Sequence, residues 1–372
     1  MTRVSERCST EEYERPVHEL RPLSRKLVFE RLQSVTNPRS IHGLYPYRGK
    51  MSPFDAMNII RQLPRNGCLL DPFCGSGTIV YESQRWGLTT YGVDNNPLAC
   101  TLSRAKTQPF DRPSTLESLK RILEHAVDTR ATHDTPDLVS RYFHPDTGKQ
   151  IMRVQQHFNE MSDYLKGAYF GAIALAARAC NHYKWSSNST GKVFMPHRSV
   201  DFFKLFAMKT RKHMDSVEHV APCSILRHDS RRLSEIIPEG SVDFVYTSPP
   251  YFDSLDYTSY YGRIIYSIIG EERQGIREGL IQSLAAYERD MKRVMSEIER
   301  VTNERATVIL VVGDKKVGKS VVNGGDFFSR LCDWRPSYVV EREYTGSSSQ
   351  IWDSINGTKR REQIIVWDRA AA

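Results

Sequence analysis

The sequence predicts an α/β fold built on a mostly parallel sheet, with a helical segment inserted in the middle of the chain. Short apolar runs at residues 68–71 and 90–94 are each followed by a helical pattern, which is the repeat of a parallel βα sheet. This alternation stops at residue 109, gives way to helical periodicity, and resumes near residue 222. A chain of 372 residues is long enough for one large domain with such an insertion.

The composition excludes several other classes of protein. No apolar run is long enough to cross a bilayer and the first residues lack the apolar core of a signal peptide, so a cytoplasmic, nucleoid-associated location is expected. Seven cysteines without a Cys-x-x-Cys pair favour reduced, mostly buried thiols over a disulfide framework or a structural zinc site. The net charge of +8 favours a polyanionic partner, but only modestly, because many proteins that bind no nucleic acid carry a similar excess.

The chain before residue 65 is predicted to contain an arm, a loop and a helix. Residues 1–40 are rich in Arg and Glu and show little periodicity, so we interpret them as a loosely ordered N-terminal arm. The loop at residues 41–53 combines turn formers, aromatic side chains and cations, and a surface turn and a ligand-contacting loop are equally good interpretations of it. Ser52 as N-cap and Pro53 at the first helical position then start a helix.

The first predicted strand, residues 68–71, is followed by a turn that carries Gly75 and Gly77 and leads into a helix at residues 79–86. Glycines at such a turn let the backbone approach a ligand closely. The turn lacks the third glycine of the dinucleotide fingerprint and the Gly-Lys-Ser/Thr of a phosphate loop. The second strand ends in Asp94, where the ribose hydroxyls of an adenosine group are often bound, although an acid there caps the next helix about as often.

Residues 109–221 make up the predicted helical insertion. Amphipathic periodicity predicts helices at residues 115–127 and 148–159, and an apolar, alanine-rich run predicts a buried helix at residues 163–180. A polar, basic and aromatic loop follows at residues 183–198. The next predicted helix carries cations that suit phosphate contact and a solvated basic face equally well: Lys204, Lys209, Arg211 and Lys212.

The second half of the sheet is predicted from residue 222 onward. Its expected strands and helix lie at residues 224–230, 242–246, 279–301 and 307–314. Two further runs, residues 338–343 and 363–367, are predicted to pair as an antiparallel hairpin.

The tetrapeptide at residues 248–251 (SPPY) leaves one of these strands at its carboxyl end. Each proline fixes its own φ and restricts the residue before it, so the strand exit is stiff. In an open parallel sheet this edge is where ligands bind. For the tetrapeptide alone, an ordinary strand-ending turn remains the simpler interpretation.

Two motifs together resemble one family. Residues 71–78 (DPFCGSGT) are similar to the cofactor loop, and residues 248–251 to the catalytic motif, of the S-adenosylmethionine-dependent DNA methyltransferases that act on exocyclic amino groups. Residues 45–53 are similar to the segment that precedes this loop in the family. The resemblance covers residues 41–107 and 222–368. It implies a Rossmann-like class I methyltransferase domain (41–108 and 222–372) with a seven-stranded, mostly parallel sheet that ends in an antiparallel hairpin.

The resemblance also implies the cofactor, S-adenosylmethionine, and the residues that bind it. The methionine part would be surrounded by Asp71, Phe73, Gly75, Gly77 and Thr78. Asp94 would hold the ribose hydroxyls, and Asp229 with Ser230 would lie at the adenine. Tyr47 and Lys50 would close over the methionine carboxylate.

The implied catalytic set is Ser248, Pro249, Pro250 and Tyr251. An exocyclic amino nitrogen is a poor nucleophile because its lone pair is delocalised into the ring. Hydrogen bonds to the Ser248 hydroxyl and the Pro249 carbonyl would favour a pyramidal nitrogen and free the lone pair for attack. Tyr251 would stack on the base after it has left the duplex. This chemistry uses neither a metal ion nor a cysteine nucleophile, so we interpret Cys74 as a packing residue.

Double-stranded DNA is the implied partner, with no membrane. Ser248 points to N4 of cytosine, because in the family a serine at this position is associated mostly with that product; N6-adenine is the alternative. The insertion is the natural target-recognition region, and DNA contacts are expected from Lys184, Lys192, Arg198, Lys209 and Arg211. A Gly/Ser-rich loop at residues 345–361 is the rival DNA site.

Two other functions stay open at this point. A cofactor loop of this spelling also occurs in tRNA guanine-N2 methyltransferases, which would make the chain an RNA amino-methyltransferase. Those enzymes carry an N-terminal RNA-binding domain and usually Asn or Asp before the two prolines, unlike this chain. A non-catalytic nucleic-acid-binding relative is the other possibility, and the intact residues 75–78 and 248–251 argue against it.

Overall fold

The computed structural model describes residues 40–47, 49–129, 135–181, 196, 198–250, 256–281, 283, 285–317, 320–344 and 360–369. The predicted arm at residues 1–40 therefore lies outside the described residues except at its last position.

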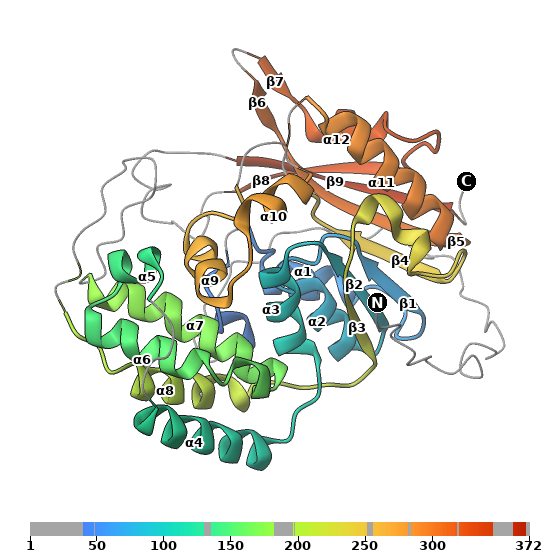
Figure 1. The fold of residues 1–372 in the computed structure, drawn as a ribbon. Coiled ribbons are helices and arrows are strands. Elements are labelled where there is room, and N and C mark those ends of the chain that lie inside the picture. Colours follow the sequence, from blue (N-terminus) through green and yellow to red (C-terminus); the bar gives the residue numbers. More distant parts are fainter. Residues whose placement is uncertain are drawn as a thin grey trace.

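A seven-stranded sheet forms the centre of the molecule (Figure 1). Its strands are β1 (Cys68–Asp71), β2 (Thr89–Asp94), β3 (Cys223–Arg227), β4 (Val242–Thr247), β5 (Thr302–Gly313), β8 (Tyr338–Tyr344) and β9 (Arg360–Asp368). They are ordered β3-β2-β1-β4-β5-β9-β8. Neighbours are parallel from β3 to β5, and β9 runs antiparallel to both β5 and β8. This confirms the predicted mostly parallel sheet with a C-terminal antiparallel hairpin.

Both faces of the sheet are covered because successive strand residues point to opposite sides. On one face Ile309 and Val311 pack with α1 (Pro53–Ile60) and α2 (Thr78–Trp86). On the other face Val308, Leu310 and Val312 pack with α11 (Tyr287–Val301) and α12 (Gly324–Ser329). This double coverage explains why β1 and β4 read as almost continuous apolar runs.

Helix boundaries follow local signals where those signals are strong. Ser52 is the N-cap of α1 and Pro53 its first residue, as predicted. Gly87 ends α2 in the left-handed conformation, with φ of 108°, which a residue without Cβ adopts at little cost. The predicted long helix at 279–301 is wrong at its start. The chain instead forms α10 (Arg273–Gly279) and then α11, and the described residues between them, 280, 281, 283, 285 and 286, are not helical.

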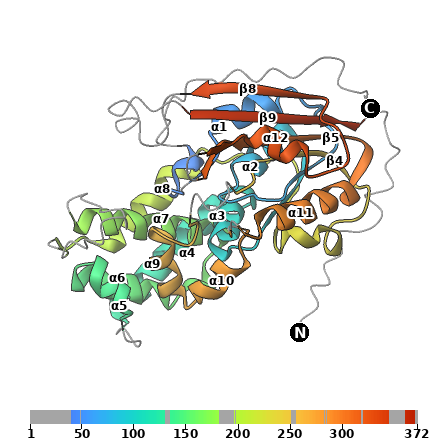
Figure 2. The same cartoon turned by 90° about the horizontal axis from the view of Figure 1, so that it is seen from above.

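Among the described residues from 112 to 214, five α-helices form what we call the helical part, which lies beside α3 (Pro97–Thr107) and away from the β8–β9 edge of the sheet (Figure 2). They are α4 (Arg112–Asp128), α5 (Asp137–Tyr142), α6 (Pro145–Gln155), α7 (Asp163–Cys180) and α8 (Phe202–Met214). Buried helix α7 is central to it. A Cβ atom at Gly171 would lie 2.1 Å from the Leu44 carbonyl oxygen, so this glycine permits close approach of the 41–44 turn.

The core of the helical part extends beyond the residue range predicted for the insertion. One apolar cluster joins α7 and α8 to Leu44, to Leu102 of α3, and to Ile264 and Ile265 of α9 (Tyr261–Ile269). Helix α9 follows residues 248–251 in sequence and was not predicted. The helical part therefore shares one apolar core with segments that precede it in sequence and with a helix that follows it. Among the described residues, no helix is both long and apolar enough to span a bilayer.

Two further elements were not predicted from the sequence. Strands β6 (Lys315–Val317) and β7 (Ser320–Val322) pair as a small antiparallel ribbon of their own, which projects beyond the end of β5 (Figure 1).

Candidate active site

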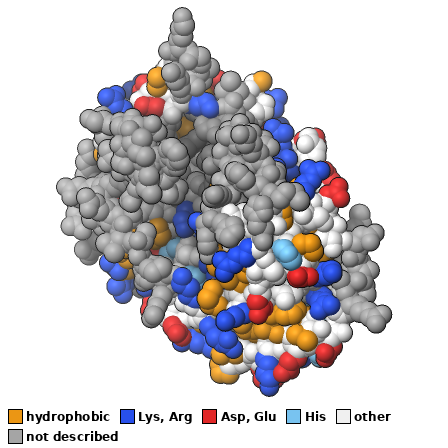
Figure 3. All heavy atoms as spheres, turned by 90° about the vertical axis from the view of Figure 1, so that its left-hand side faces the viewer, with side chains coloured by type: hydrophobic (Ala, Val, Ile, Leu, Met, Phe, Trp, Pro, Cys, Tyr) orange, Lys and Arg blue, Asp and Glu red, His pale blue; other side chains and the backbone are white. Residues whose placement is uncertain are grey.

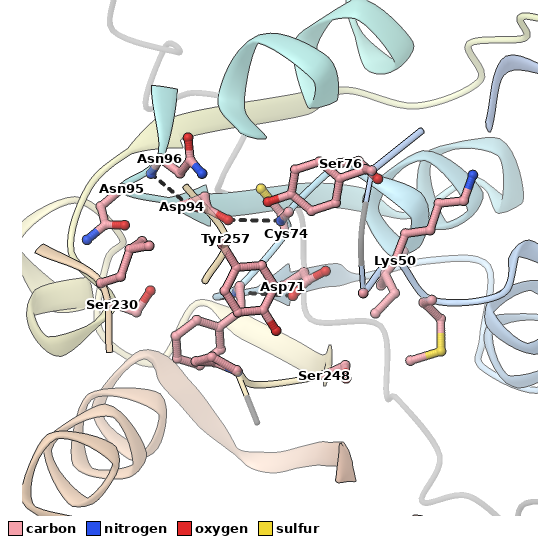
Figure 4. Close-up of a pocket in the computed structure, with 18 of the residues that line it drawn as sticks. Lys50, Asp71, Cys74, Ser76, Asp94, Asn95, Asn96, Ser230, Ser248 and Tyr257 are labelled. Atoms are coloured by element: carbon pink, nitrogen blue, oxygen red, sulfur yellow. Dashed lines mark hydrogen bonds between the residues drawn. The ribbon is translucent and has the colours of Figure 1, made fainter. Parts of the chain in front are cut away.

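A pocket opens at the carboxyl ends of β1, β2 and β4 (Figure 4). The predicted site residues that line it are Tyr47, Lys50, Asp71, Phe73, Gly75, Thr78, Asp94, Asp229, Ser230, Ser248 and Pro250. Gly77 and Pro249 lie next to that lining in sequence without being part of it. Tyr251 lies outside the described residues.

The two glycines of the loop are required for different structural reasons. Gly75 and Gly77 both have positive φ, at 51° and 73°. A Cβ atom at Gly77 would lie 2.7 Å from Ser103 Oγ on α3, so Gly77 is needed for helix packing. Gly75 instead faces the pocket, where a Cβ atom would lie 3.4 Å from Cε1 of Tyr47. Ser103 also donates a hydrogen bond of 2.9 Å to the Gly75 carbonyl, which fixes the loop on α3.

Asp71 connects the glycine loop at residues 71–78 to β4. Its side chain is 2% exposed, and Oδ1 accepts hydrogen bonds from Thr247 Oγ1 at 2.6 Å and from the Phe73 N–H at 3.1 Å. Burial raises the pKa of Asp71 to about 7, although both hydrogen bonds act in the opposite direction. Thr247 immediately precedes Ser248, so one buried hydrogen bond joins the loop to the strand end that leads into the predicted catalytic tetrapeptide. The role of Thr247 was not predicted.

Asp94 is held by the glycine loop. Its Oδ2 accepts a hydrogen bond from the Gly75 N–H at 3.0 Å, and its Oδ1 accepts one from the Asn96 N–H at 2.9 Å. Burial raises the pKa of Asp94 to about 6. The N-cap of α3 is Asn96, whose side chain accepts from the Leu98 N–H at 3.0 Å. The capping interpretation of Asp94 is therefore wrong, and the carboxylate belongs to the pocket.

Asp229 and Ser230 are both committed to protein partners. Asp229 forms an ion pair of 2.7 Å with Arg231, which also pairs with Asp290 of α11 at 2.9 Å. Burial alone would raise the pKa of Asp229, but the bonds from Arg231 outweigh it and hold that pKa below its usual value. The Ser230 hydroxyl donates to the Pro72 carbonyl. These contacts give the pocket a rigid wall on the β3 side.

The exit of β4 is tied down as well. Ser248 is half-buried and lines the pocket, and Pro249 is buried behind it. The Tyr287 hydroxyl, on α11, donates a hydrogen bond to the Pro250 carbonyl. The stiffness expected from two prolines is thus reinforced by a contact from a helix that lies far along the chain.

Lys50 and Lys209 each bond to the loop around residue 43. Lys50 lines the pocket and donates to the His42 carbonyl at 2.8 Å, and burial lowers its pKa. Lys209 donates to the Gly43 carbonyl at 2.8 Å, is 9% exposed, and has its pKa lowered by burial to about 8. The predicted DNA contact by Lys209 is therefore wrong for this structure, since its ammonium points inward to hold the loop.

The other predicted DNA contacts belong in sequence to α8 and to the segment between α7 and α8. Arg198 and Arg211 are exposed, whereas Lys184 and Lys192 lie outside the described residues, as do residues 345–359 of the rival loop. Figure 3 shows Lys and Arg side chains interspersed with acidic and apolar ones on the outer face of this part.

The pocket also contains residues that the sequence did not single out, among them Asn95, Tyr257, Leu280 and Ile281. Asn95 Nδ2 donates to the Gly279 carbonyl at 2.5 Å, which joins β2 to the end of α10. The break between α10 and α11 places Leu280 and Ile281 at the pocket wall. Cys74 lines the pocket too, but burial raises the pKa of its thiol well above the usual value, which suits a packing role. Among the described residues, no group of His, Cys, Asp and Glu is arranged to hold a metal ion.

Comparison with known proteins gives two curated relatives. The chain is 28% identical to the type II methyltransferase M.MvaI of Kocuria varians over 256 residues, which is 60% of this chain and 56% of that protein. It is 31% identical to the type II methyltransferase M.MjaII of Methanocaldococcus jannaschii over 98 residues, 26% of this chain and 18% of that protein. Both relatives are type II methyltransferases, the class of enzyme that the two motifs of this chain resemble. The chain spans about half the length of the first relative and under a fifth of the second.

No protein-family model matches the chain. Among solved structures, the rRNA methyltransferase AviRa of Streptomyces viridochromogenes aligns over 86% of both chains with 14% identity and a TM-score of 0.31, which is too low to bear on this fold.

Proposed function

We propose that this methyltransferase transfers a methyl group from S-adenosylmethionine to the exocyclic amino group of a base extruded from duplex DNA, and that the base is cytosine, methylated at N4. The observation that carries the proposal is that Ser248 lines the same pocket as Asp71, Gly75 and Asp94. The methyltransferase relatives are its second support. They imply S-adenosylmethionine as the methyl donor.

The residues of the pocket fit this donor. The hydroxyls of Ser76 and Thr78 line the pocket and are buried without a hydrogen-bond partner among the described residues, so they can bond to a ligand. The raised pKa values of Asp71 and Asp94 indicate that the pocket favours a cationic ligand, which would stabilise both carboxylates. Lys50 supplies a cation on another part of the wall, suited to a carboxylate.

In the proposed chemistry, the residues that follow β4 activate the amino group of the base. The amino group of the base would donate hydrogen bonds to the Ser248 hydroxyl and the Pro249 carbonyl, which favours a pyramidal nitrogen with its lone pair available. That lone pair attacks the methyl carbon in line with the carbon–sulfur bond, the bond electrons return to sulfur, and the nitrogen loses a proton to solvent. S-adenosylmethionine supplies an electrophilic methyl group on a sulfonium centre. Because the amino group is out of reach in a stacked duplex, the base must leave the helix.

A transfer assay tests the activity. The purified chain is incubated with tritiated S-adenosylmethionine and either duplex DNA or RNA, with Ser248→Ala as the matched inactive variant. Label in DNA that depends on Ser248 is the expected result. Label in RNA alone would replace DNA by RNA as the substrate, and no label in either would overturn the proposal.

The base is tested separately. Methylated DNA is digested to nucleosides and analysed by mass spectrometry. N4-methyldeoxycytidine is expected because Ser248 occupies the first position of the tetrapeptide. N6-methyldeoxyadenosine as the sole product would contradict the cytosine assignment while leaving the methyltransferase assignment intact.

We further propose that the helical part recognises the DNA. Arg198 and Arg211 supply exposed cations on it, and Lys184 and Lys192 belong to the segment between α7 and α8. Phosphate contacts of this kind position a duplex and make its binding salt-dependent.

A further inference from the structure

We infer that Tyr257 and Tyr47 form an aromatic wall that recognises the positive charge of the sulfonium centre, so that Tyr257 makes the site bind the charged methyl donor in preference to its neutral thioether product. This inference rests on the proposed function and extends it to the selection between substrate and product.

Both rings belong to the pocket and lie close to its carboxylates. Tyr47 and Tyr257 line it together with Asp71 and Asp94. Tyr47 lies over Gly75, and burial followed by the charge of Asp94 and the nearby phenol of Tyr257 raises its pKa well above the usual value. Its ring is therefore neutral at physiological pH. In Figure 4 Tyr257 lies beside Asp71 and Asp94, in the middle of the pocket.

Tyr257 is positioned by both of its sequence neighbours. Asp256 Oδ1 accepts hydrogen bonds from the Thr258 N–H at 2.9 Å and the Thr258 hydroxyl at 2.6 Å. Arg273 of α10 donates to Asp256 Oδ2 at 2.6 Å and to the Thr258 carbonyl at 3.1 Å. One arginine thus clamps the residues on either side of Tyr257. A pre-positioned ring loses little conformational entropy when a ligand binds.

The backbone after this clamp is also constrained. Tyr260, the N-cap of α9, has φ of 64° and is the one described non-glycine residue with positive φ. Such a conformation persists only where surrounding contacts determine it. The chain from Asp256 to α9 therefore holds Tyr257 in place and includes a strained backbone position, and such positions cluster at functional sites.

Ring faces and buried carboxylates act on a ligand in the same direction. The face of an aromatic ring carries negative electrostatic potential and attracts a cation, most strongly where water is excluded. S-adenosylmethionine carries a permanent charge on sulfur, whereas S-adenosylhomocysteine has an uncharged thioether and one methyl group fewer. The two ligands share every other group that the pocket can contact, so the ring wall and the two carboxylates are the parts of the site that can tell them apart by charge, and replacement of Tyr257 isolates the contribution of the ring.

The test compares both ligands by isothermal titration calorimetry on the wild-type chain, Tyr257→Leu and Tyr257→Phe. A cation–π contact of this kind corresponds to roughly a 5- to 30-fold difference in affinity. Tyr257→Leu should lose that factor for S-adenosylmethionine and change by less than about twofold for S-adenosylhomocysteine. Tyr257→Phe, which keeps the ring, should retain the wild-type ratio.

A second series removes the charge attraction without changing the shape. Replacing Tyr257 by phenylalanine with zero, one, two or three ring fluorines progressively weakens the negative potential of the ring face. Affinity for S-adenosylmethionine should fall with each fluorine while that for S-adenosylhomocysteine stays constant. Equal loss for both ligands in either series, or no loss for either, would overturn the inference. Failure of the wild-type chain to bind either ligand would instead overturn the proposed function.

Discussion

The pocket at the carboxyl ends of the strands and the helical part differ in how their charged side chains are placed. In the pocket, Asp71 is buried and Asp94 is half-buried, and each oxygen partner of these carboxylates is a specific hydroxyl or backbone N–H. On the helical part, Arg198 and Arg211 are exposed, and Figure 3 shows cations mixed with acids. A buried charge interacts strongly with a few specific partners, so removing one of them should change ligand affinity or activity by a large factor. An exposed charge contributes to an electrostatic potential that many side chains share, so removing one such charge should change affinity only slightly.

The largest effect is expected at the chemical step. Replacing Ser248 by alanine removes one proposed hydrogen-bond acceptor of the amino group, and loss of one such group typically costs about 100- to 1,000-fold in kcat. Affinity for S-adenosylmethionine, measured by calorimetry, should change by less than about threefold, because the hydroxyl acts on the base. Arg211→Ala on the helical part is the control and should leave kcat intact. A Ser248→Ala variant with normal turnover would remove Ser248 from the mechanism.

Asp71 should show the next largest effect, together with a dependence on pH. In the ligand-free pocket the pKa of Asp71 is about 7 and that of Asp94 about 6, and the ionised forms are the ones that a cation stabilises. Affinity for S-adenosylmethionine should therefore rise as pH increases from about 5.5 and level off above the higher pKa. Asp71→Asn should weaken binding about 10- to 100-fold, as expected for an unpaired buried charge.

The control for this titration is the same variant. Asp71→Asn should flatten the part of the pH profile near 7 and leave the part near 6, which belongs to Asp94. Calorimetry across the pH range measures both. A wild-type affinity that falls with rising pH would contradict the assignment of these carboxylates to a cationic ligand.

The comparison also shows what the sequence could predict. Strands, the glycine loop and the tetrapeptide were predicted because each is specified by neighbours in sequence: apolar runs, positive-φ glycines and prolines. Thr247, Tyr257 and the clamp by Arg273 could not be, since each acts across 15 or more positions of the chain. The helix break before α11 was missed because residues 279–286 have helical composition while tertiary contacts turn Leu280 and Ile281 into the pocket.

On the helical part, the DNA contacts were predicted from residue type alone, and residue type does not distinguish an exposed cation from a buried one. Lys209 and Arg211 lie two positions apart on α8, yet Lys209 points into the core and Arg211 to solvent. A helix turns by about 100° per residue, so two positions suffice to change face. The periodicity of Phe202, Phe206 and Thr210, all buried, could have placed Lys209 near the inner face.

A smaller effect is expected when exposed cations are removed. Alanine at Lys184, Lys192 and Arg198 together should weaken duplex binding about tenfold at moderate salt and reduce the slope of log affinity against log salt by about 0.9 for each phosphate that the protein no longer neutralises. Affinity for S-adenosylmethionine is the control and should not change, because Arg198 is not among the described residues that line the pocket. Fluorescence anisotropy at several salt concentrations measures the slope, and an unchanged DNA affinity would exclude this surface.

The smallest effect on DNA is expected from Lys209, although it was predicted as a DNA contact. Lys209→Met keeps the length of the side chain and removes the bond to the Gly43 carbonyl, so the loop that carries Lys50 loses one of its two ammonium anchors. A hydrogen bond to a charged group contributes about 1.5–3 kcal/mol, and part of it is recovered because a buried ammonium no longer has to be desolvated. The midpoint temperature of thermal unfolding should therefore fall modestly, while DNA affinity stays within about twofold of wild type.

Lys212→Met, on the exposed face of the same helix, is the matched control and should show no change in the unfolding temperature. A large loss of DNA affinity in Lys209→Met with unchanged unfolding would mean that this ammonium turns outward when DNA binds, and the contrast between buried and exposed cations on α8 would not hold.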